Sequence, residues 1–333
     1  MGKVEGSAED RLIARYFRPL ASHPGALGLA DDAAILVPPP GCDLVLKADA
    51  IIGDVHFFPE DPADAIARKA LRVNLSDLAA KGAKPLGFLL SLALPGGSDD
   101  AWLASFADGL HADAQLYGCP LLGGDTDRTP GPAMVSIAAF GTVPHGGMVR
   151  RSGAKSGDCV FVSGMIGDAA LGLKLRREPG AAARYRLEPR EREHLLARYL
   201  VPEPRLALSE TIRLHASAAM DVSDGLAGDL AKLCGASGVS ADIEIEKVPF
   251  SDAAKRMIAA DADLRELAVT GGDDYEIVCA VPTEKRDAFC TAALAAGVAV
   301  TEIGRIVVGR AAPKFRDRNG RLLEFAHPSF SHF

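Results

Sequence analysis

The sequence predicts a mixed α/β (α+β) chain with two domains, and three observations lead to this fold class. Helix-like and strand-like segments mix along the 333 residues without the strict strand–helix–strand repeat of a doubly wound sheet. A chain of this length usually forms one large domain or two ordinary ones. A polar, glycine-bearing stretch at residues 150–158 interrupts the apolar pattern and is either a domain boundary or a ligand loop. We therefore expect an N-terminal domain over residues 1–148 and a C-terminal domain over residues 149–333.

Hydrophobic periodicity predicts the elements of the N-terminal half. Ser7 is a suitable N-cap for a first helix, and the glycine-rich acidic loop after this helix leads into short strands. The helix that starts at Pro62 either continues or is interrupted at residues 74–77, before Gly82 closes it. The expected helices are 8–17, 62–73 and 99–117, and the expected strands are 33–37, 43–47, 88–94 and 134–143.

The C-terminal half is expected to mix short strands and helices in the same way. Residues 177–192 are charged and contain two prolines, so we expect a mobile, variable excursion there rather than a site. The expected strands are 159–163, 239–245, 277–281 and 298–308, and the expected helices are 168–176, 190–199, 205–216, a segment from 225 to 234, and 283–296.

Composition excludes several classes of partner. The formal net charge is −7 and no basic stripe is present, which argues against nucleic acid. The six cysteines form no CxxC pair and mostly lie in apolar surroundings, which is typical of reduced core thiols in a cytosolic protein. No signal peptide and no uninterrupted apolar run of about 18 residues is evident. We expect a cytoplasmic protein that binds neither nucleic acid nor a membrane.

Six aspartates share one kind of setting, beside small residues and next to an apolar run. A lone loop aspartate is most often a helix cap or a turn residue, and that explanation is adequate for Asp10, Asp61 or Asp99. Six such carboxylates brought together without cations would repel each other. Mg²⁺ prefers oxygen ligands and is commonly held by one or two carboxylates plus substrate phosphates. The pattern therefore predicts a site for several magnesium ions, formed by Asp31, Asp49, Asp77, Asp125, Asp221 and Asp224.

The phosphate-binding motifs of other enzyme classes are missing from the sequence. It contains no P-loop, no GxGxxG between a strand and a helix, and no HRD or DFG triplet. Gly-Gly-Asp occurs at 123–125 and at 271–273, where paired glycines would let backbone N–H groups approach a phosphate or would simply form a turn. Residues 221–225 flank a serine with two aspartates at a helix start, which suits both an anion site and an ordinary N-cap.

Three further residues each allow two interpretations. Arg151 is either a phosphate-binding fork or a solvated linker arginine. His56 follows Asp49 by seven residues and is either a ligand contact or a loop histidine with its own partners. Phe330, near the C-terminus, is either a stacking residue or part of the core.

Taken in order, eight segments resemble the thiamine-monophosphate kinases and, more widely, the aminoimidazole ribonucleotide synthetase-like ATP enzymes. The resemblance extends over nearly the whole chain, and Asp49 with His56 and the 271–276 segment favours the thiamine kinases over their relatives. The segments are 28–34, 47–57, 74–80, 123–126, 151–158, 220–226, 271–276 and 303–305.

The resemblance implies ATP-dependent phosphorylation of thiamine phosphate to thiamine diphosphate, by direct transfer and without a dedicated base. It implies an N-terminal domain whose sheet forms a homodimer, and a C-terminal α/β domain. The six aspartates above would hold several Mg²⁺ ions. The residues that would contact ATP are Gly124, Asp125, Arg151 and Ser223. The residues that would contact thiamine phosphate are His56, Asp273 and Phe330.

The chain departs from the family pattern at the predicted site. Lys47 and Ala48 replace a pair of hydroxyl residues, so only a backbone carbonyl could bind magnesium there, and Asp273 is one methylene shorter than the usual Glu. Two other functions stay open: another ATP-using enzyme of the superfamily, and a non-catalytic nucleotide-binding relative. Against the first, no reactive cysteine lies near the N-terminal loop or in a C-terminal tail.

Overall fold

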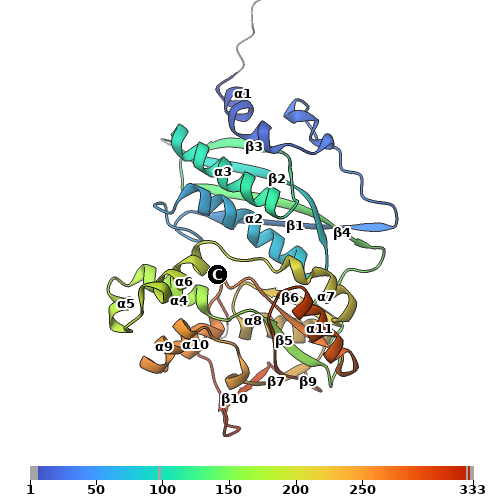
Figure 1. Cartoon of the computed structure of the whole chain (residues 1–333), viewed down its shortest axis with the longest axis vertical. Coiled ribbons are helices and arrows are strands. Elements are labelled where there is room, and N and C mark those ends of the chain that lie inside the picture. Colours follow the sequence, from blue (N-terminus) through green and yellow to red (C-terminus); the bar gives the residue numbers. More distant parts are fainter. Residues whose placement is uncertain (1–6, 97–98, 328, 331–333) are drawn as a thin grey trace, which may run out of the picture. The chain divides into compact units, whose positions relative to one another are not determined.

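The computed structural model describes residues 7–96, 99–327 and 329–330 (Figure 1). The chain divides into two compact units. Unit 1 contains the residues up to Leu75 and Lys84–Gly146, and unit 2 contains Ser76–Ala83 and the residues from Gly147 onward. Unit 2 therefore includes a short piece from the first half of the chain, which the composition of the sequence does not indicate.

Unit 1 is built on a four-stranded sheet with the order β1-β4-β2-β3. Strand β4 pairs antiparallel with both β1 and β2, whereas β2 and β3 are parallel. A parallel pair needs a crossover connection, and the helix α3 provides it. The strands are β1 (Cys42–Ile52), β2 (Lys84–Pro95), β3 (Leu121–Thr129) and β4 (Met134–Pro144).

Helices α2 (Ala63–Ala80) and α3 (Asp100–Leu116) lie on one face of this sheet (Figure 1). The alternation along β2 explains why: Phe88, Leu90 and Leu92 are buried, while Ser91 between them is exposed. The predicted 62–73 helix continues through residues 74–77 without interruption. Its Arg72 guanidinium holds the Asp113 carboxylate of α3 with N–O distances of 2.5 and 2.8 Å.

The segment before β1 differs from the prediction. The first helix is shorter than expected, and no strand forms at residues 33–37. Instead the Ile35 N–H donates to the Gly25 carbonyl at 2.8 Å, and the three prolines at 38–40 have no N–H group to offer a sheet. The elements are α1 (Ala8–Leu12), a π-helical turn η1 (Ile13–Phe17), and 3₁₀ turns η2 (Arg18–Leu20) and η3 (Pro24–Leu29).

Unit 2 is built on a seven-stranded sheet with the order β11-β10-β7-β9-β5-β8-β6. All neighbours are antiparallel except β10 and β7. The strands are β5 (Cys159–Ser163), β6 (Ala218–Val222), β7 (Ser240–Glu244), β8 (Glu276–Val281), β9 (Val300–Val307), β10 (Lys314–Arg316) and β11 (Leu322–Leu323).

Apolar clusters cover both faces of the unit 2 sheet, which explains why its central strands are apolar throughout. On β5, Val160 and Val162 face the cluster that contains helix α8 (Leu226–Ser237), while Phe161 faces the other cluster. That second cluster contains α7 (Ser209–His215) and α11 (Arg286–Ala295).

A separate helical cluster forms the remainder of unit 2, and here the sequence-based expectation for 177–192 is wrong. Part of that segment is helical, and Ala181 and Tyr185 are buried in the cluster. Two of its helices, α9 and α10, were not predicted, because each is short and lies between polar residues. The helices are α4 (Asp168–Arg177), α5 (Ala181–Arg184), α6 (Pro189–Leu200), α9 (Asp252–Ala260) and α10 (Leu264–Thr270), and the 3₁₀ turns are η4 (Leu206–Leu208), η5 (Ile245–Lys247) and η6 (Thr283–Lys285).

His194 links α6 to the start of α4, and we expect it to make the stability of this cluster pH-dependent. Its Nε2 lies 2.6 Å from Asp168 Oδ2, and this hydrogen bond raises the pKa of His194, opposed by burial and by Arg198. A raised folded-state pKa stabilises the protein fully below the unfolded value of about 6.5. We expect the free energy of unfolding to fall as the pH rises through the folded pKa, and His194→Gln to remove this component. Unfolding curves of both proteins at several pH values test it; equal pH dependence would contradict it.

No helix in the described parts of the chain is long and apolar enough to cross a membrane. All six cysteines are unpaired. Burial raises the pKa of Cys119 and of Cys234 to about 12, so these thiols stay protonated at neutral pH.

Candidate functional site

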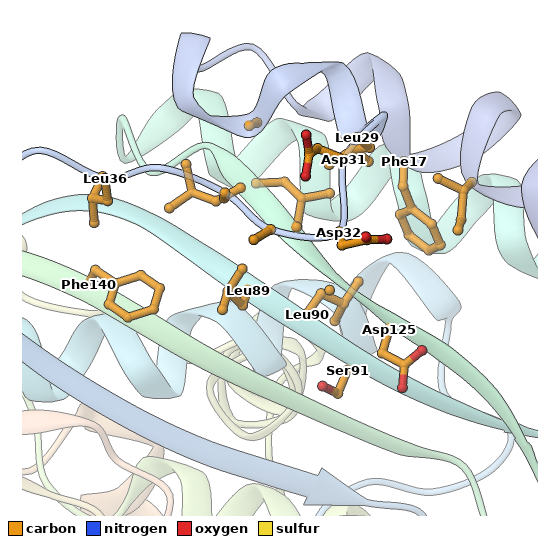
Figure 2. Close-up of a pocket in the computed structure, with 18 of the residues that line it drawn as sticks. Phe17, Leu29, Asp31, Asp32, Leu36, Leu89, Leu90, Ser91, Asp125 and Phe140 are labelled. Atoms are coloured by element: carbon orange, nitrogen blue, oxygen red, sulfur yellow. The ribbon is translucent and has the colours of Figure 1, made fainter.

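A cavity of about 670 Å³ in unit 1 is lined by two predicted magnesium ligands, Asp31 and Asp125, and by Asp32, which follows Asp31 in the chain (Figure 2). Asp31, Asp32 and Asp125 lie at one end of it, and Leu36 and Phe140 lie at the other. The wall is otherwise largely apolar, formed by residues before β1 and by the sheet face that the helices leave uncovered. The cavity therefore combines an acidic end with an apolar floor.

Gly124 precedes Asp125 on edge strand β3, and its backbone lies against β2. A Cβ atom added at this position would lie 1.8 Å from the Leu90 carbonyl oxygen, so no side chain fits. From the sequence, residues 123–125 could have formed a phosphate-binding loop or a simple turn. In the structure they are part of strand β3.

We expect Gly124→Ala to push β3 away from β2 and to destabilise unit 1 by about 1–3 kcal/mol. Nucleotide affinity should fall as well, because Asp125 moves with the strand. Thermal unfolding and ATP titration measure the two effects. Gly96→Ala is the control, because a Cβ atom there meets nothing within 4 Å; equal behaviour of the two variants would refute the steric argument.

Asp49 lies inside β1 and not beyond its end, because the strand expected at 43–47 continues to Ile52. Its backbone N–H donates to Asn74 Oδ1 of α2 at 2.9 Å, which fixes this part of β1 to the helix. The Lys47 ammonium lies 3.0 Å from the Asp49 carboxylate on the same face of the strand. Where the family pattern has hydroxyl groups, this chain therefore places a positive charge.

Asp49 and Asp125 do not meet within this sheet. Asp49 is opposite Ile137, Ile137 is opposite Leu90, and Leu90 is opposite Gly124. The two aspartates therefore lie on the two edge strands, three strand spacings or about 14 Å apart along the sheet. Since they differ by one residue in register, their side chains leave opposite faces. In one copy of unit 1, a single ion cannot bind both.

His56 lies in the loop after β1, and a hydrogen bond to the backbone fixes the orientation of its imidazole ring. Its Nδ1 accepts the Ile52 N–H at 3.0 Å, so the neutral ring carries its proton on Nε2, which acts as a donor. The buried ammonium of Lys69, which is 2% exposed, donates to the His56 carbonyl at 2.9 Å. A histidine donor in a fixed orientation suits a phosphate oxygen.

In unit 2, the end of β6 brings three predicted residues together. Asp221 is in β6 and is 3% exposed, and Ser223 and Asp224 follow the strand. The backbone N–H groups of Ser223 and Asp224 both donate to Asp229 Oδ2, at 2.9 and 2.8 Å. Burial raises the pKa of Asp229, and the Lys232 ammonium, which contacts both Asp229 and Asp224, opposes that effect.

Two predicted substrate contacts come from distant parts of the chain to this same place. The Asp273 N–H donates to the Ser223 carbonyl at 2.9 Å, and the Phe330 N–H donates to the Asp224 carbonyl at 3.0 Å. Phe330 is 51% exposed, so it is not part of the core. The structure thus groups Asp221, Ser223, Asp224, Asp273 and Phe330 within unit 2.

Arg151 and Asp77 also belong to unit 2. The Arg151 carbonyl accepts the Ser237 hydroxyl at 3.3 Å, and the preceding residue bonds to Ala219 near the start of β6. The exposed Arg151 is thus at the end of β6 opposite Ser223. Asp77 lies near the C-terminal end of α2, one helical turn after Asn74.

The donor atoms of the six aspartates fit magnesium, because all are carboxylate oxygens. Among the described residues, no three His, Cys, Asp or Glu side chains converge as a ready-made metal site. Asp31 and Asp125 instead line the cavity of unit 1, Asp221 and Asp224 lie at the end of β6, Asp49 is in β1, and Asp77 is near the C-terminal end of α2. Such a distribution suits ions whose coordination is completed by substrate phosphates.

Three residues that contact or anchor the predicted site segments were not among the candidates from the sequence. Asp229 accepts the Ser223 N–H, Lys69 donates to the His56 carbonyl, and the buried Asp274, next to Asp273, accepts the Gly167 N–H at the start of α4. One signal for Asp229 was available: a lone carboxylate within the apolar run 226–230 of a helix. No comparable local signal distinguishes Lys69, which lies in an alanine-rich helix with other charged residues.

Comparisons with known proteins show the family of the chain. Residues 30–143 match the family model of the AIR synthase related protein, N-terminal domain, and residues 155–313 match that of its C-terminal domain. The thiamine-monophosphate kinase of Caulobacter vibrioides is 45% identical over 306 residues, covering 89% of this chain and 83% of that protein. The crystal structure of thiamine-monophosphate kinase from Stenotrophomonas maltophilia superposes with a TM-score of 0.82 at 38% identity, covering 96% of this chain and 98% of that one.

A second solved structure carries ligands. AaThiL complexed with AMPPCP and TMP matches with a TM-score of 0.75 at 31% identity, covering 91% of each chain. The similarity extends over both domains and is well above the level at which only the fold is shared. This chain belongs to the thiamine-monophosphate kinase family of AIR synthase related proteins.

Proposed function

We propose that this chain transfers the terminal phosphoryl group of ATP to thiamine phosphate, forming thiamine diphosphate and ADP. The main support is the structural neighbour that binds AMPPCP and TMP and covers 91% of this chain. The acidic residues at the cavity and at the end of β6 support the same reaction, because phosphoryl transfer depends mostly on positioning and on charge neutralisation.

In the proposed reaction, the bond between the γ-phosphorus and the bridging oxygen of ATP breaks, and a phosphate oxygen of thiamine phosphate forms the new bond. That acceptor oxygen is already largely ionised at neutral pH, so no side chain has to remove a proton. The proposed roles are therefore binding roles. His56 Nε2 donates to the acceptor phosphate, Asp273 and Phe330 contact thiamine phosphate, and Ser223 contacts ATP.

Gly124, Asp125 and Arg151 complete the proposed ATP contacts. Asp31, Asp49, Asp77, Asp125, Asp221 and Asp224 would hold several Mg²⁺ ions. When bound, magnesium would offset the negative charge of the phosphates during transfer. The carboxylates would hold these ions, and Lys47 adds a positive charge beside Asp49.

We also propose a homodimer that pairs the sheets of the N-terminal domains, in the cytoplasm. Leu44 and Leu46, on the β1 face away from the helices, are 40% and 67% exposed and border the cavity. A second copy would cover this apolar face. Unpaired cysteines support a reducing compartment. Light scattering should give twice the 34.8 kDa mass of one chain; a monomer at assay concentration would contradict the dimer.

The function is tested by incubating the purified chain with Mg-ATP and thiamine phosphate and separating the products by chromatography. We expect thiamine diphosphate and ADP in equal amounts, and no ADP when thiamine phosphate is omitted. ATP binding without product would overturn the kinase assignment. ADP formation without thiamine phosphate would instead indicate another ATP-using reaction.

A further inference from the structure

Residues 271–275, here called the acidic loop, connect α10 to β8 in a strained conformation. Asp273 and Tyr275 both have left-handed backbones, with φ of 76° and 51°. For residues other than glycine, this conformation costs about 1–3 kcal/mol each and persists only where the surroundings impose it. The strain therefore needs an explanation in the contacts of the loop.

One part of the explanation is that the loop is bonded to the end of β6. The Asp273 N–H donates to the Ser223 carbonyl at 2.9 Å, and the Tyr275 N–H donates to the Val222 carbonyl at 2.8 Å. Gly272 permits this approach, because a Cβ atom there would lie 2.4 Å from the Ser223 carbonyl oxygen. The two left-handed residues thus place their N–H groups on the segment that carries Ser223.

The other part is Asp274, whose side chain is directed into the protein between the two left-handed residues. Asp274 is 1% exposed, and its carboxyl oxygens accept the Gly167 N–H at 2.7 Å and the Ala169 N–H at 3.3 Å, at the start of α4. Arg198 of α6 donates to the Asp274 carbonyl at 3.2 Å. Burial raises the pKa of Asp274 well above its ordinary value, so this placement is itself unfavourable unless the hydrogen bonds compensate.

We propose that Asp274 is a positioning residue for the phosphoryl acceptor: by anchoring the acidic loop to α4, it holds Asp273 against Ser223 in the geometry that binds thiamine phosphate. Asp274 itself touches no substrate. The inference rests on the proposed function for the role of Asp273, while the anchoring of the loop stands on the hydrogen bonds alone.

The test uses Asp274→Asn, which keeps the size of the side chain but retains only one acceptor oxygen for the two N–H groups. Arg198→Lys is a second variant that removes the guanidinium bond to the loop carbonyl and leaves the Asp274 carboxyl unchanged. It also alters the pair of Arg198 with the buried Glu276, so its free energy of unfolding is measured alongside its activity. Asp113→Asn is the control, because Asp113 is 2% exposed and paired to Arg72 in unit 1, whereas the acidic loop belongs to unit 2.

In Asp274→Asn, we expect kcat/KM for thiamine phosphate to fall about 10- to 100-fold, since small displacements of a binding group have effects of this size. The KM for ATP should change less than about threefold. Arg198→Lys should also lower kcat/KM for thiamine phosphate more than it changes the KM for ATP, but by a smaller factor. If Asp274→Asn impairs the use of ATP as much as the use of thiamine phosphate, the proposal is overturned. Such an equal effect is what the control should show if it acts only through stability.

Hydrogen exchange gives a readout that does not need turnover. The amides of Asp273 and Tyr275 should exchange faster in Asp274→Asn than in the wild type, and they should be unchanged in Asp113→Asn. If these two amides exchange in Asp274→Asn as slowly as in the wild type, Asp274 does not anchor the loop, even if the activity falls. If the wild type forms no thiamine diphosphate, the proposed function fails, and the exchange rates still decide whether Asp274 holds the loop.

Discussion

Asp49→Asn is expected to lower kcat by about 10²–10³-fold or more while leaving the fold intact. The substitution removes one negative charge from the proposed magnesium site and keeps the size of the side chain. The fold should survive, because the contact that fixes Asp49 to α2 is made by its backbone N–H, which donates to Asn74. Turnover of thiamine phosphate and the number of bound Mn²⁺ ions, counted by electron paramagnetic resonance, should fall together.

Asp54→Asn is the matched control for this variant. Asp54 is exposed in the loop after β1 and has a left-handed backbone with φ of 65°, which asparagine also adopts readily. Its turnover and metal count should match the wild type. If Asp49→Asn retains turnover and metal, Asp49 is not part of the magnesium site, and the role proposed for the β1 segment is wrong.

Glu276→Ala is expected to destabilise unit 2 by about 3–5 kcal/mol, the usual effect of removing one partner from a buried ion pair. Glu276 is fully buried at the start of β8. Its oxygens accept from Arg205 Nε at 2.7 Å, from Arg198 at 3.0 Å and from the Ser163 hydroxyl at 2.6 Å. Removing the carboxylate leaves two partly buried arginines without this counter-charge.

The loss of stability in Glu276→Ala is compared with the losses in two further variants. Glu276→Gln keeps most hydrogen bonds and should lose about 1–3 kcal/mol. Glu203→Ala removes a second carboxylate from the same two arginines, but Glu203 is 57% exposed, so its loss should be about 0–1 kcal/mol. Chemical denaturation followed by far-ultraviolet circular dichroism measures these values, since the single tryptophan, Trp102, reports on unit 1. A loss for Glu276→Ala no larger than for Glu203→Ala would contradict the prediction.

Local periodicity was sufficient for the long elements. Helices α2 and α3 and strands β2, β4 and β5 lie close to their predicted positions, because each has a regular apolar pattern over many residues. It failed where the pattern was short or conflicting. Residues 33–37 look like a strand but precede three prolines, and α9 and α10 are brief helices stabilised by packing within their cluster.

The sequence by itself determined the candidates for the chemistry, which are recognisable from residue type and order: the six aspartates, the two Gly-Gly-Asp segments, His56 and Phe330. Only the tertiary structure decided which of them are neighbours. It separated Asp49 from Asp125 through the strand order, and it joined Asp224 to the C-terminal segment across 105 residues of chain. Strand order and long-range hydrogen bonds depend on how apolar faces are buried together, which no local pattern records. For the same reason the sequence did not single out Asp274, whose proposed positioning role rests on its burial against the start of α4.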